Sequence, residues 1–149
     1  MVQFNLQPST SPVRTLIVET IVVVATSLTL TLTPSSAPPG AIITYSGKLT
    51  RADGLATGVQ PIKLRDDMSG AIIATTSTDA SGNYSATFTA PPTDGSYYYF
   101  TQFDGAVMGT AFLAPSSSLV RETTVGIPYL QIGGPLLVGL LTVFISMRK

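Results

Sequence analysis

The sequence contains no cysteine, histidine or tryptophan among its 149 residues. Without cysteine the chain can form no disulfide framework, no thiol nucleophile and no cysteine-based zinc site. Without histidine it lacks the commonest general base and metal ligand of proteins. Little material for catalysis remains, and we expect a protein that is not an enzyme and that holds no cofactor and no metal.

Charged residues are also scarce, with 8 basic and 8 acidic side chains and a formal net charge of zero. A balanced and sparse set of charges gives no basic surface for phosphate groups, so no nucleic acid is expected as a partner. Hydrophobic residues make up 44% of the chain. A chain of this length accommodates one domain of ordinary size together with its tails.

A long uncharged stretch that is apolar over most of its length lies at the C-terminal end, where 25 residues from Thr123 to Met147 carry no formal charge. A helix of about 20 residues matches the roughly 30 Å hydrocarbon core of a bilayer. We therefore predict a hydrophobic transmembrane helix with a basic end over residues 126–149, with membrane lipid as its partner. An apolar helix buried in a protein assembly is the alternative. The residues predicted to form the anchor are Leu136, Leu137, Leu140, Leu141, Phe144, Arg148 and Lys149.

The basic end of this segment also predicts an orientation. Cationic residues beside a membrane helix favour the cytoplasmic side, so Lys149 is expected in the cytoplasm or in the interior of a particle. The remaining residues then face outward, on a cell surface or a viral envelope. The N-terminal residues do not match a secretory signal, because no basic region precedes the first apolar run.

Residues 1–25 form an N-terminal extension whose apolar run, residues 15–25, is dense in β-branched side chains. The run contains Glu19 and is too short to span a bilayer, so it predicts a β-strand. This strand has no obvious partner, which leaves two alternatives. It extends the first strand or a hairpin of its own domain, or it adds to an exposed sheet edge of a neighbouring subunit. The residues of this predicted strand exchange are Leu16, Val18, Ile21 and Val23.

Between the two ends, turn signals recur every 8 to 12 residues, a spacing typical of a β-sandwich or barrel. Residues 27–33 alternate between leucine and hydroxyl-bearing side chains, which predicts a strand that buries Leu28, Leu30 and Leu32. No helical periodicity appears before residue 127. Further strands are predicted over residues 42–50, 62–65, 71–77, 84–89, 97–103, 107–113 and 116–125.

A set of turn and strand motifs occurs in a fixed order along this central region. They are residues 26–30 (TSLTL), 34–40 (PSSAPPG), 46–50 (SGKLT), 78–84 (TDASGNY), 91–97 (PPTDGSY) and 103–105 (FDG). Together they resemble the immunoglobulin-like repeat domains of archaeal and bacterial surface proteins, over residues 26–125. The resemblance implies an all-β, immunoglobulin-like antiparallel β-sandwich. It implies little about function, because such domains serve as spacers, adhesins, coat elements and assembly modules.

Four short motifs suggest sites. Asn83 opens an Asn-x-Ser triplet, the acceptor pattern for N-glycosylation, although the same residue suits a turn with positive φ. Residues 79–83 carry oxygen-bearing side chains at alternate positions, but no bidentate carboxylate follows and a turn is favoured over a calcium loop. Asp66 and Asp67 suggest an acid/base pair or a metal site, but the side chains of adjacent residues at the end of a strand point apart, so a solvated loop is expected. The aromatic residues 97–100 suggest a stacking platform for a sugar or single-stranded nucleic acid, but no Lys or Arg lies beside them, so nucleic acid is not expected. Alternation along a strand places Tyr97 and Tyr99 on one face and Tyr98 and Phe100 on the other, and one face is expected to be core.

The interpretation that best combines these features is a structural surface protein. We expect a membrane-anchored immunoglobulin-like module that self-assembles as a homo-oligomer into a surface layer, a filament or a virion coat, on an archaeal cell or a virus of archaea. One alternative is an adhesin or receptor-binding spike that uses loops near residues 52–54, 66–70 and 104–107. The other is an accessory subunit of a membrane complex.

Overall fold

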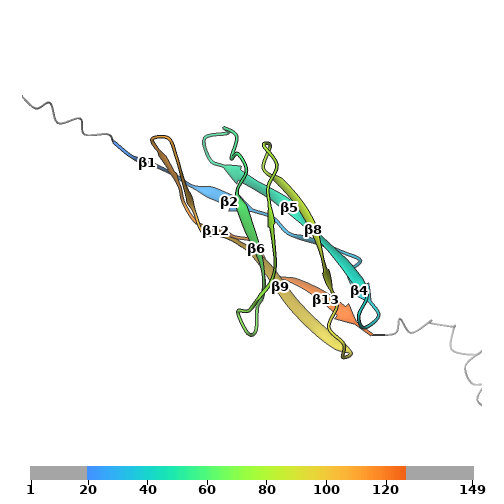
Figure 1. The fold of residues 1–149 in the computed structure, drawn as a ribbon. Coiled ribbons are helices and arrows are strands. Elements are labelled where there is room, and N and C mark those ends of the chain that lie inside the picture. The colour runs from blue at the N-terminus through green and yellow to red at the C-terminus, as the bar shows by residue number, and fades with distance from the viewer. Residues whose placement is uncertain (1–19, 127–149) are drawn as a thin grey trace, which may run out of the picture.

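The computed structural model describes residues 20–126, which form β-strands joined by turns and loops, with no helix in that range (Figure 1). The strands are β1 (Val22–Val24), β2 (Thr26–Leu28), β3 (Thr31–Thr33), β4 (Ser36–Ala37), β5 (Ile42–Arg51), β6 (Pro61–Asp66), β7 (Ile72–Ser77), β8 (Asn83–Thr89), β9 (Gly95–Phe103), β10 (Ala106–Met108), β11 (Ala111–Leu113), β12 (Ser116–Ser117) and β13 (Arg121–Val125).

The strands form two main sheets. In the first sheet β5 pairs with β2 and β3 along one side and with β8 along the other, always antiparallel. The second sheet has the order β4-β13-β9-β6-β7, with β12 also beside β9. A small third sheet, β1-β11-β10, lies at one end of the molecule (Figure 1). This arrangement is an immunoglobulin-like β-sandwich, as the sequence predicts.

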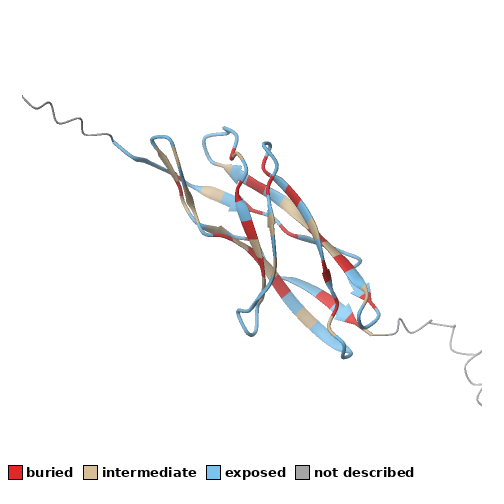
Figure 2. Ribbon diagram, viewed as in Figure 1, coloured by how far each residue is buried: buried red, intermediate tan, exposed pale blue. Residues whose placement is uncertain are grey.

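The core lies between the two main sheets and is built by alternation along each strand. In β5 the side chains of Ile43, Tyr45 and Leu49 are fully buried, and buried and exposed residues alternate in the neighbouring strands (Figure 2). The rings of Phe88 in β8 and Tyr99 in β9 meet edge to face at 5.0 Å between centroids, so aromatic packing joins the two layers. Burial of Leu28, Leu30 and Leu32 confirms the pattern read from residues 27–33.

The predicted strand over residues 27–33 is nevertheless two strands, β2 and β3. At the break the Lys48 backbone N–H donates to the Thr29 hydroxyl at 2.9 Å, so a side chain replaces a ladder partner. Gly47 in β5 makes the break possible, because a Cβ at that position would lie 2.0 Å from the Thr29 carbonyl oxygen. The interruption therefore depends on the close approach of two backbones, which alternation alone does not reveal.

The prediction of one strand over residues 107–113 is wrong. These residues form the hairpin of β10 and β11, with Val107 opposite Phe112 and Met108 opposite Ala111. The chain reverses at Gly109, whose φ of +60° lies in the left-handed region that glycine adopts without strain. A turn within an apolar run is therefore difficult to predict when a single glycine is its only sequence signal.

The two ends of the described domain lie at opposite ends of the sandwich, with β1 at one and the last residues of β13 at the other (Figure 1). The predicted membrane segment, residues 126–149, lies outside the described residues except for Gly126. No helix capable of spanning a bilayer occurs among residues 20–126. Leu16 and Val18, predicted as strand-exchange residues, also lie outside the described part of the chain.

Candidate assembly surface

β1 lies beside β11 of the same chain, in parallel. Val22, Val23 and Val24 are level with Ala111, Phe112 and Leu113. Two backbone hydrogen bonds of 2.9 Å join the ends of the two strands. The Val22 N–H donates to the Thr110 carbonyl, and the Ala114 N–H donates to the Val24 carbonyl. The N-terminal run therefore extends a hairpin of its own domain over these residues, which is one of the two arrangements that the sequence leaves open.

The other edge of β1 has no partner among residues 20–126. Backbone groups of successive residues in a strand point to opposite sides, and those of Val22 and Val24 point toward β11. The N–H and C=O of Val23 consequently point away from β11, toward the free edge. An open edge of this kind is a template for another strand.

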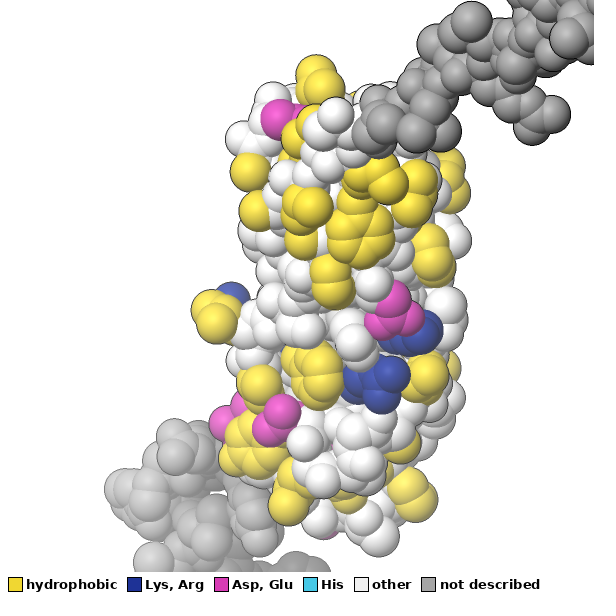
Figure 3. All heavy atoms as spheres, turned by 90° about the vertical axis from the view of Figure 1, so that its left-hand side faces the viewer, with side chains coloured by type: hydrophobic (Ala, Val, Ile, Leu, Met, Phe, Trp, Pro, Cys, Tyr) yellow, Lys and Arg dark blue, Asp and Glu magenta, His cyan; other side chains and the backbone are white. Residues whose placement is uncertain are grey.

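The outward face of this small sheet is apolar. Ile21 is 61% exposed, Val23 68% and Val107 67%, and the half-buried ring of Phe112 lies level with Val23 and Val107. Paired residues share a face, so Val23, Phe112 and Val107 lie side by side, and Ile21 lies two residues before Val23. We call these four side chains the β1 patch. Figure 3 looks onto this part of the molecule, and hydrophobic side chains gather in its upper half above an acidic and a basic group.

The β10–β11 hairpin, with which β1 pairs, is joined to the rest of the domain by polar contacts. The side-chain amide of the buried Gln60 donates to the Thr57 carbonyl at 2.9 Å and to the Met108 sulfur at 3.4 Å. The Met108 methyl group also lies close to Gly58. At the base of the hairpin Lys63 and Asp104 form an exposed ion pair. The β1 patch is therefore fixed to the loop before β6.

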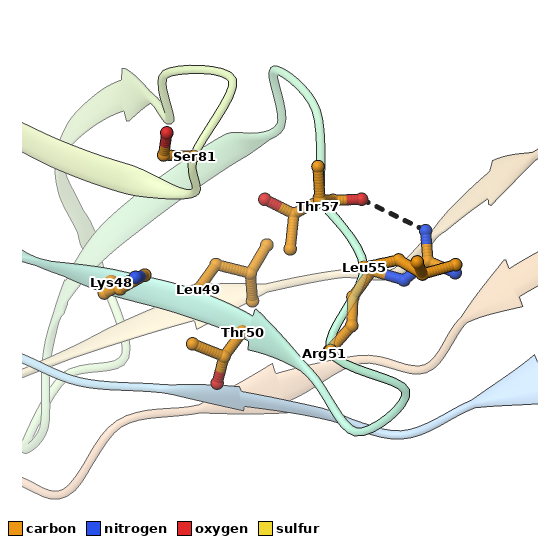
Figure 4. Close-up of a pocket in the computed structure, with 9 residues that line it drawn as sticks. Lys48, Leu49, Thr50, Arg51, Leu55, Thr57 and Ser81 are labelled. Atoms are coloured by element: carbon orange, nitrogen blue, oxygen red, sulfur yellow. Dashed lines mark hydrogen bonds between the residues drawn. The ribbon is translucent and has the colours of Figure 1, made fainter.

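A shallow groove of about 420 Å³ lies at the same end of the sandwich (Figure 4). Lys48, Leu49 and Thr50 of β5 run along it, while Thr57 and Ser81 border it from two loops. Other residues contribute to the loop wall. Arg51 binds the Asp53 carboxylate at 2.6 and 3.0 Å and the Ala56 carbonyl at 3.1 Å, so its guanidinium holds the loop in place.

The acidic residues singled out in the sequence serve turns. Asp66 accepts hydrogen bonds from the hydroxyl and the N–H of Ser69, at 2.6 and 2.7 Å, which lower its pKa. Asp79 accepts from the side-chain amide and backbone of Asn83, and these bonds lower its pKa. Among residues 20–126 no three acidic, cysteine or histidine side chains gather as a metal site would require.

The loops proposed for an adhesin do not share one end of the molecule. Residues 52–54 precede β6 and residues 66–70 follow it, so they lie at its opposite ends. Residues 104–107 lie at the same end of the molecule as residues 52–54, because Lys63 near the start of β6 pairs with Gln102 near the end of β9. The sequence reasoning also missed Val107 and Phe112 as part of a surface patch. Their shared face could have been recognised only from the turn at Gly109.

The described residues thus define an immunoglobulin-like β-sandwich module whose most prominent exposed feature is a sheet edge beside an apolar patch. No family model matches the chain, and no curated protein matches it. Similar solved structures exist for a CARDB domain from Pyrococcus furiosus. Its crystal structure, in complex with di-metal ions, has 12% identity and a TM-score of 0.47, and covers 80% of this chain and 100% of that one.

The solution structure of that domain has 11% identity and a TM-score of 0.43, and covers 68% of this chain and 93% of that one. A cycloisomaltooligosaccharide glucanotransferase of Paenibacillus sp., complexed with cycloisomaltoheptaose, has 16% identity and a TM-score of 0.39. That match covers 72% of this chain and 15% of the enzyme. At such identities the similarity concerns the fold, and no ligand or activity follows from it.

Proposed function

We propose that this protein is a non-enzymatic structural surface module that assembles with copies of itself through the free edge of β1, and that residues 126–149 anchor it in a membrane. The observation that supports assembly is the Val23 backbone, whose N–H and C=O point away from the domain beside the exposed β1 patch. Strand addition at this edge would pair those groups and bury the apolar side chains at the same time.

The energetics favour such a contact. Burying one exposed valine side chain contributes about 1.5 kcal/mol, and each additional backbone hydrogen bond contributes about 1 kcal/mol net. The side chains of Ile21, Val23 and Val107 are all more than half exposed. Covering them on both copies and pairing the free edge contributes roughly 11 kcal/mol, which is comparable with the roughly 4–15 kcal/mol that association costs.

The test compares the full-length protein in mild detergent with two variants of matched chemistry. Val23→Lys places a charge on the free edge of β1, and Met68→Lys places the same charge on a methionine that is 85% exposed in the turn after β6, at the other end of that strand. We measure mass by light scattering over a hundredfold range of concentration and inspect the particles by negative-stain imaging. The wild type and Met68→Lys should form ordered oligomers, and Val23→Lys should raise the dissociation constant at least about tenfold.

A third variant isolates the backbone. Val23→Pro removes the outward N–H but leaves the β1–β11 hydrogen bonds at Val22 and Val24 intact. It should weaken assembly while the far-ultraviolet circular dichroism of the domain stays the same. A wild type that remains monomeric throughout, or a Val23→Pro variant that assembles as the wild type does, refutes assembly through this edge.

A further inference from the structure

The chain has two asparagines, and one of them begins an Asn-x-Ser triplet. Asn5 is followed by Leu6 and Gln7, whereas Asn83 is followed by Tyr84 and Ser85. In the structure Asn83 and Ser85 are both exposed on the outer face of β8, while Tyr84 between them points into the core and is 4% exposed. The two side chains that an N-glycosylation enzyme recognises therefore lie together on an open surface.

The turn between β7 and β8 does not need an asparagine at position 83. No residue other than glycine has a positive φ among residues 20–126, and the left-handed position of this turn is taken by Gly82, with φ of +86°. Residue 83 takes part in the turn through its backbone. Its carbonyl accepts a hydrogen bond from the Asp79 N–H at 2.7 Å, and its N–H donates to an Asp79 carboxylate oxygen at 2.9 Å. The explanation of Asn83 as a turn residue with positive φ is therefore excluded.

The Asn83 side-chain amide makes a single kind of contact. Its Nδ2 donates to the two Asp79 carboxylate oxygens at 3.2 and 3.5 Å, on the exposed surface. A glycosylated amide keeps one N–H, which can still donate to Asp79. The local structure of the folded hairpin is thus compatible with a sugar on Nδ2.

The surrounding surface carries little charge and is rich in hydroxyl groups. Along β5, β8 and the strands beside them, the outward side chains include a single charged residue, Lys48, which lies opposite Asn83. Such a face offers many hydrogen-bonding groups, and its one large apolar side chain is that of Ile42 at the end of β5, which is 60% exposed. The outward hydroxyl-bearing residues are Ser27, Thr29, Thr31, Thr33, Thr44, Ser46, Thr50, Ser85, Thr87 and Thr89.

We propose that Asn83 is the acceptor of an N-linked glycan that lies over this hydroxyl-rich face. The co-substrate is an oligosaccharide carried on a polyprenyl phosphate or pyrophosphate. A bond forms between Nδ2 and the anomeric carbon of the first sugar, the bond from that carbon to the phosphate oxygen breaks, and the lipid phosphate leaves. The amide gives up one proton to a base, and nothing is oxidised or reduced.

The structure also sets the order of events. Asn83 to Ser85 pair with Lys48 to Ser46 of β5, and the Tyr84 ring is buried. The triplet must be free of this pairing to enter a transferase, so the glycan is added before β8 joins β5. Any change that delays this pairing without altering the triplet should raise the glycosylated fraction.

The test uses the full chain, exported by a secretory leader in a host that attaches N-glycans to Asn-x-Ser/Thr. Intact mass and peptide mapping are measured for the wild type and for Asn83→Gln, Ser85→Ala and Ser85→Thr. Position 85 is exposed, so these two substitutions leave the core unchanged while removing or keeping the acceptor hydroxyl. We expect hexose-containing mass on Asn83 in the wild type and in Ser85→Thr, and its complete loss in Asn83→Gln and Ser85→Ala.

An enzyme that cleaves the glycan from asparagine should convert Asn83 to aspartate, which adds one mass unit at that peptide. Secreted and folded wild type and Ser85→Thr with only the bare sequence mass overturn the proposal. Sugar that persists in Ser85→Ala and resists the enzyme also overturns it, because the glycan is then linked to serine or threonine. The result is independent of assembly at β1, since the readout is mass and not oligomeric state.

Discussion

Two buried tyrosines of the same core should respond in opposite ways to loss of the hydroxyl. Tyr45 is fully buried, and its hydroxyl has no hydrogen-bond partner among residues 20–126. Tyr84 is also buried, but its hydroxyl bonds the Thr101 hydroxyl at 2.9 Å and the Thr29 carbonyl. The two rings are 6.3 Å apart, so they share one environment. The substitutions Tyr45→Phe and Tyr84→Phe therefore form a matched pair.

The magnitudes follow from the hydrogen-bond inventory. A buried hydroxyl without a partner costs about 1–3 kcal/mol, and removing it leaves a small void that costs roughly half of one kcal/mol. Tyr45→Phe should therefore raise the free energy of unfolding by about 1 kcal/mol. Tyr84→Phe breaks two bonds and leaves the buried Thr101 hydroxyl unpaired, so it should lower the free energy of unfolding by about 2 kcal/mol.

The assay is thermal unfolding followed by far-ultraviolet circular dichroism, because the chain has no tryptophan. For a domain near 100 residues, 1 kcal/mol corresponds to roughly 4–8 °C in Tm, so the two variants should lie well apart on either side of the wild type. Equal destabilisation by Tyr45→Phe and Tyr84→Phe would refute the reasoning, because it would mean that the Tyr45 hydroxyl has a partner such as a buried water.

The remaining predictions concern a glycine and the dependence on pH. Gly47→Ala should lower the free energy of unfolding by at least about 2 kcal/mol, because the added Cβ would lie 2.0 Å from the Thr29 carbonyl oxygen. The control is Gly126→Ala, whose Cβ would meet nothing closer than 3.8 Å and which should be nearly neutral. Thermal unfolding measures both. Stability measured by urea titration should be almost flat between about pH 5 and 9, because histidine is absent. Burial raises the pKa of Tyr84 and of Tyr99 to about 12. The folded state thus keeps protons that the unfolded chain releases near pH 10, and stability should fall as pH rises from 10 to 12. Unchanged stability at pH 12 would contradict the burial of these phenols.

Alternation was sufficient to predict the inner faces of the main sheets. It identified Leu28, Leu30 and Leu32 in the first sheet and placed Tyr97 and Tyr99 on the same face of β9, where Tyr99 is 2% exposed. Alternation succeeds here because side chains of a strand point to opposite faces at every second residue, whatever the partner strand. The fold class could therefore be predicted from residues that are near one another in the sequence.

The candidate site could not be predicted in the same way. The pairing of β1 with β11 joins residues about ninety positions apart, and nothing in the composition of Val22–Val24 specifies Ala111–Leu113 as the partner. Loop closure over such a distance is decided by the rest of the fold. The β1 patch also depends on the turn at Gly109, which brings Val107 level with Phe112. Both features are consequences of tertiary structure.

The edges of the sandwich connect the two proposals. Proteins protect exposed edges with short strands, bulges, charges or proline. Here β3 and β4 have three and two residues, and β7 faces an irregularity in β6 between Leu64 and Arg65. β8 is different, because it has seven residues without charge or proline and pairs on one side only. A glycan on its first residue, Asn83, would shield this long edge. β1 is as short as β3, but it has neither a charge nor such a shield, and the exposed side chains of Ile21 and Val23 lie beside its edge. The edge available for ordered assembly would therefore be that of β1.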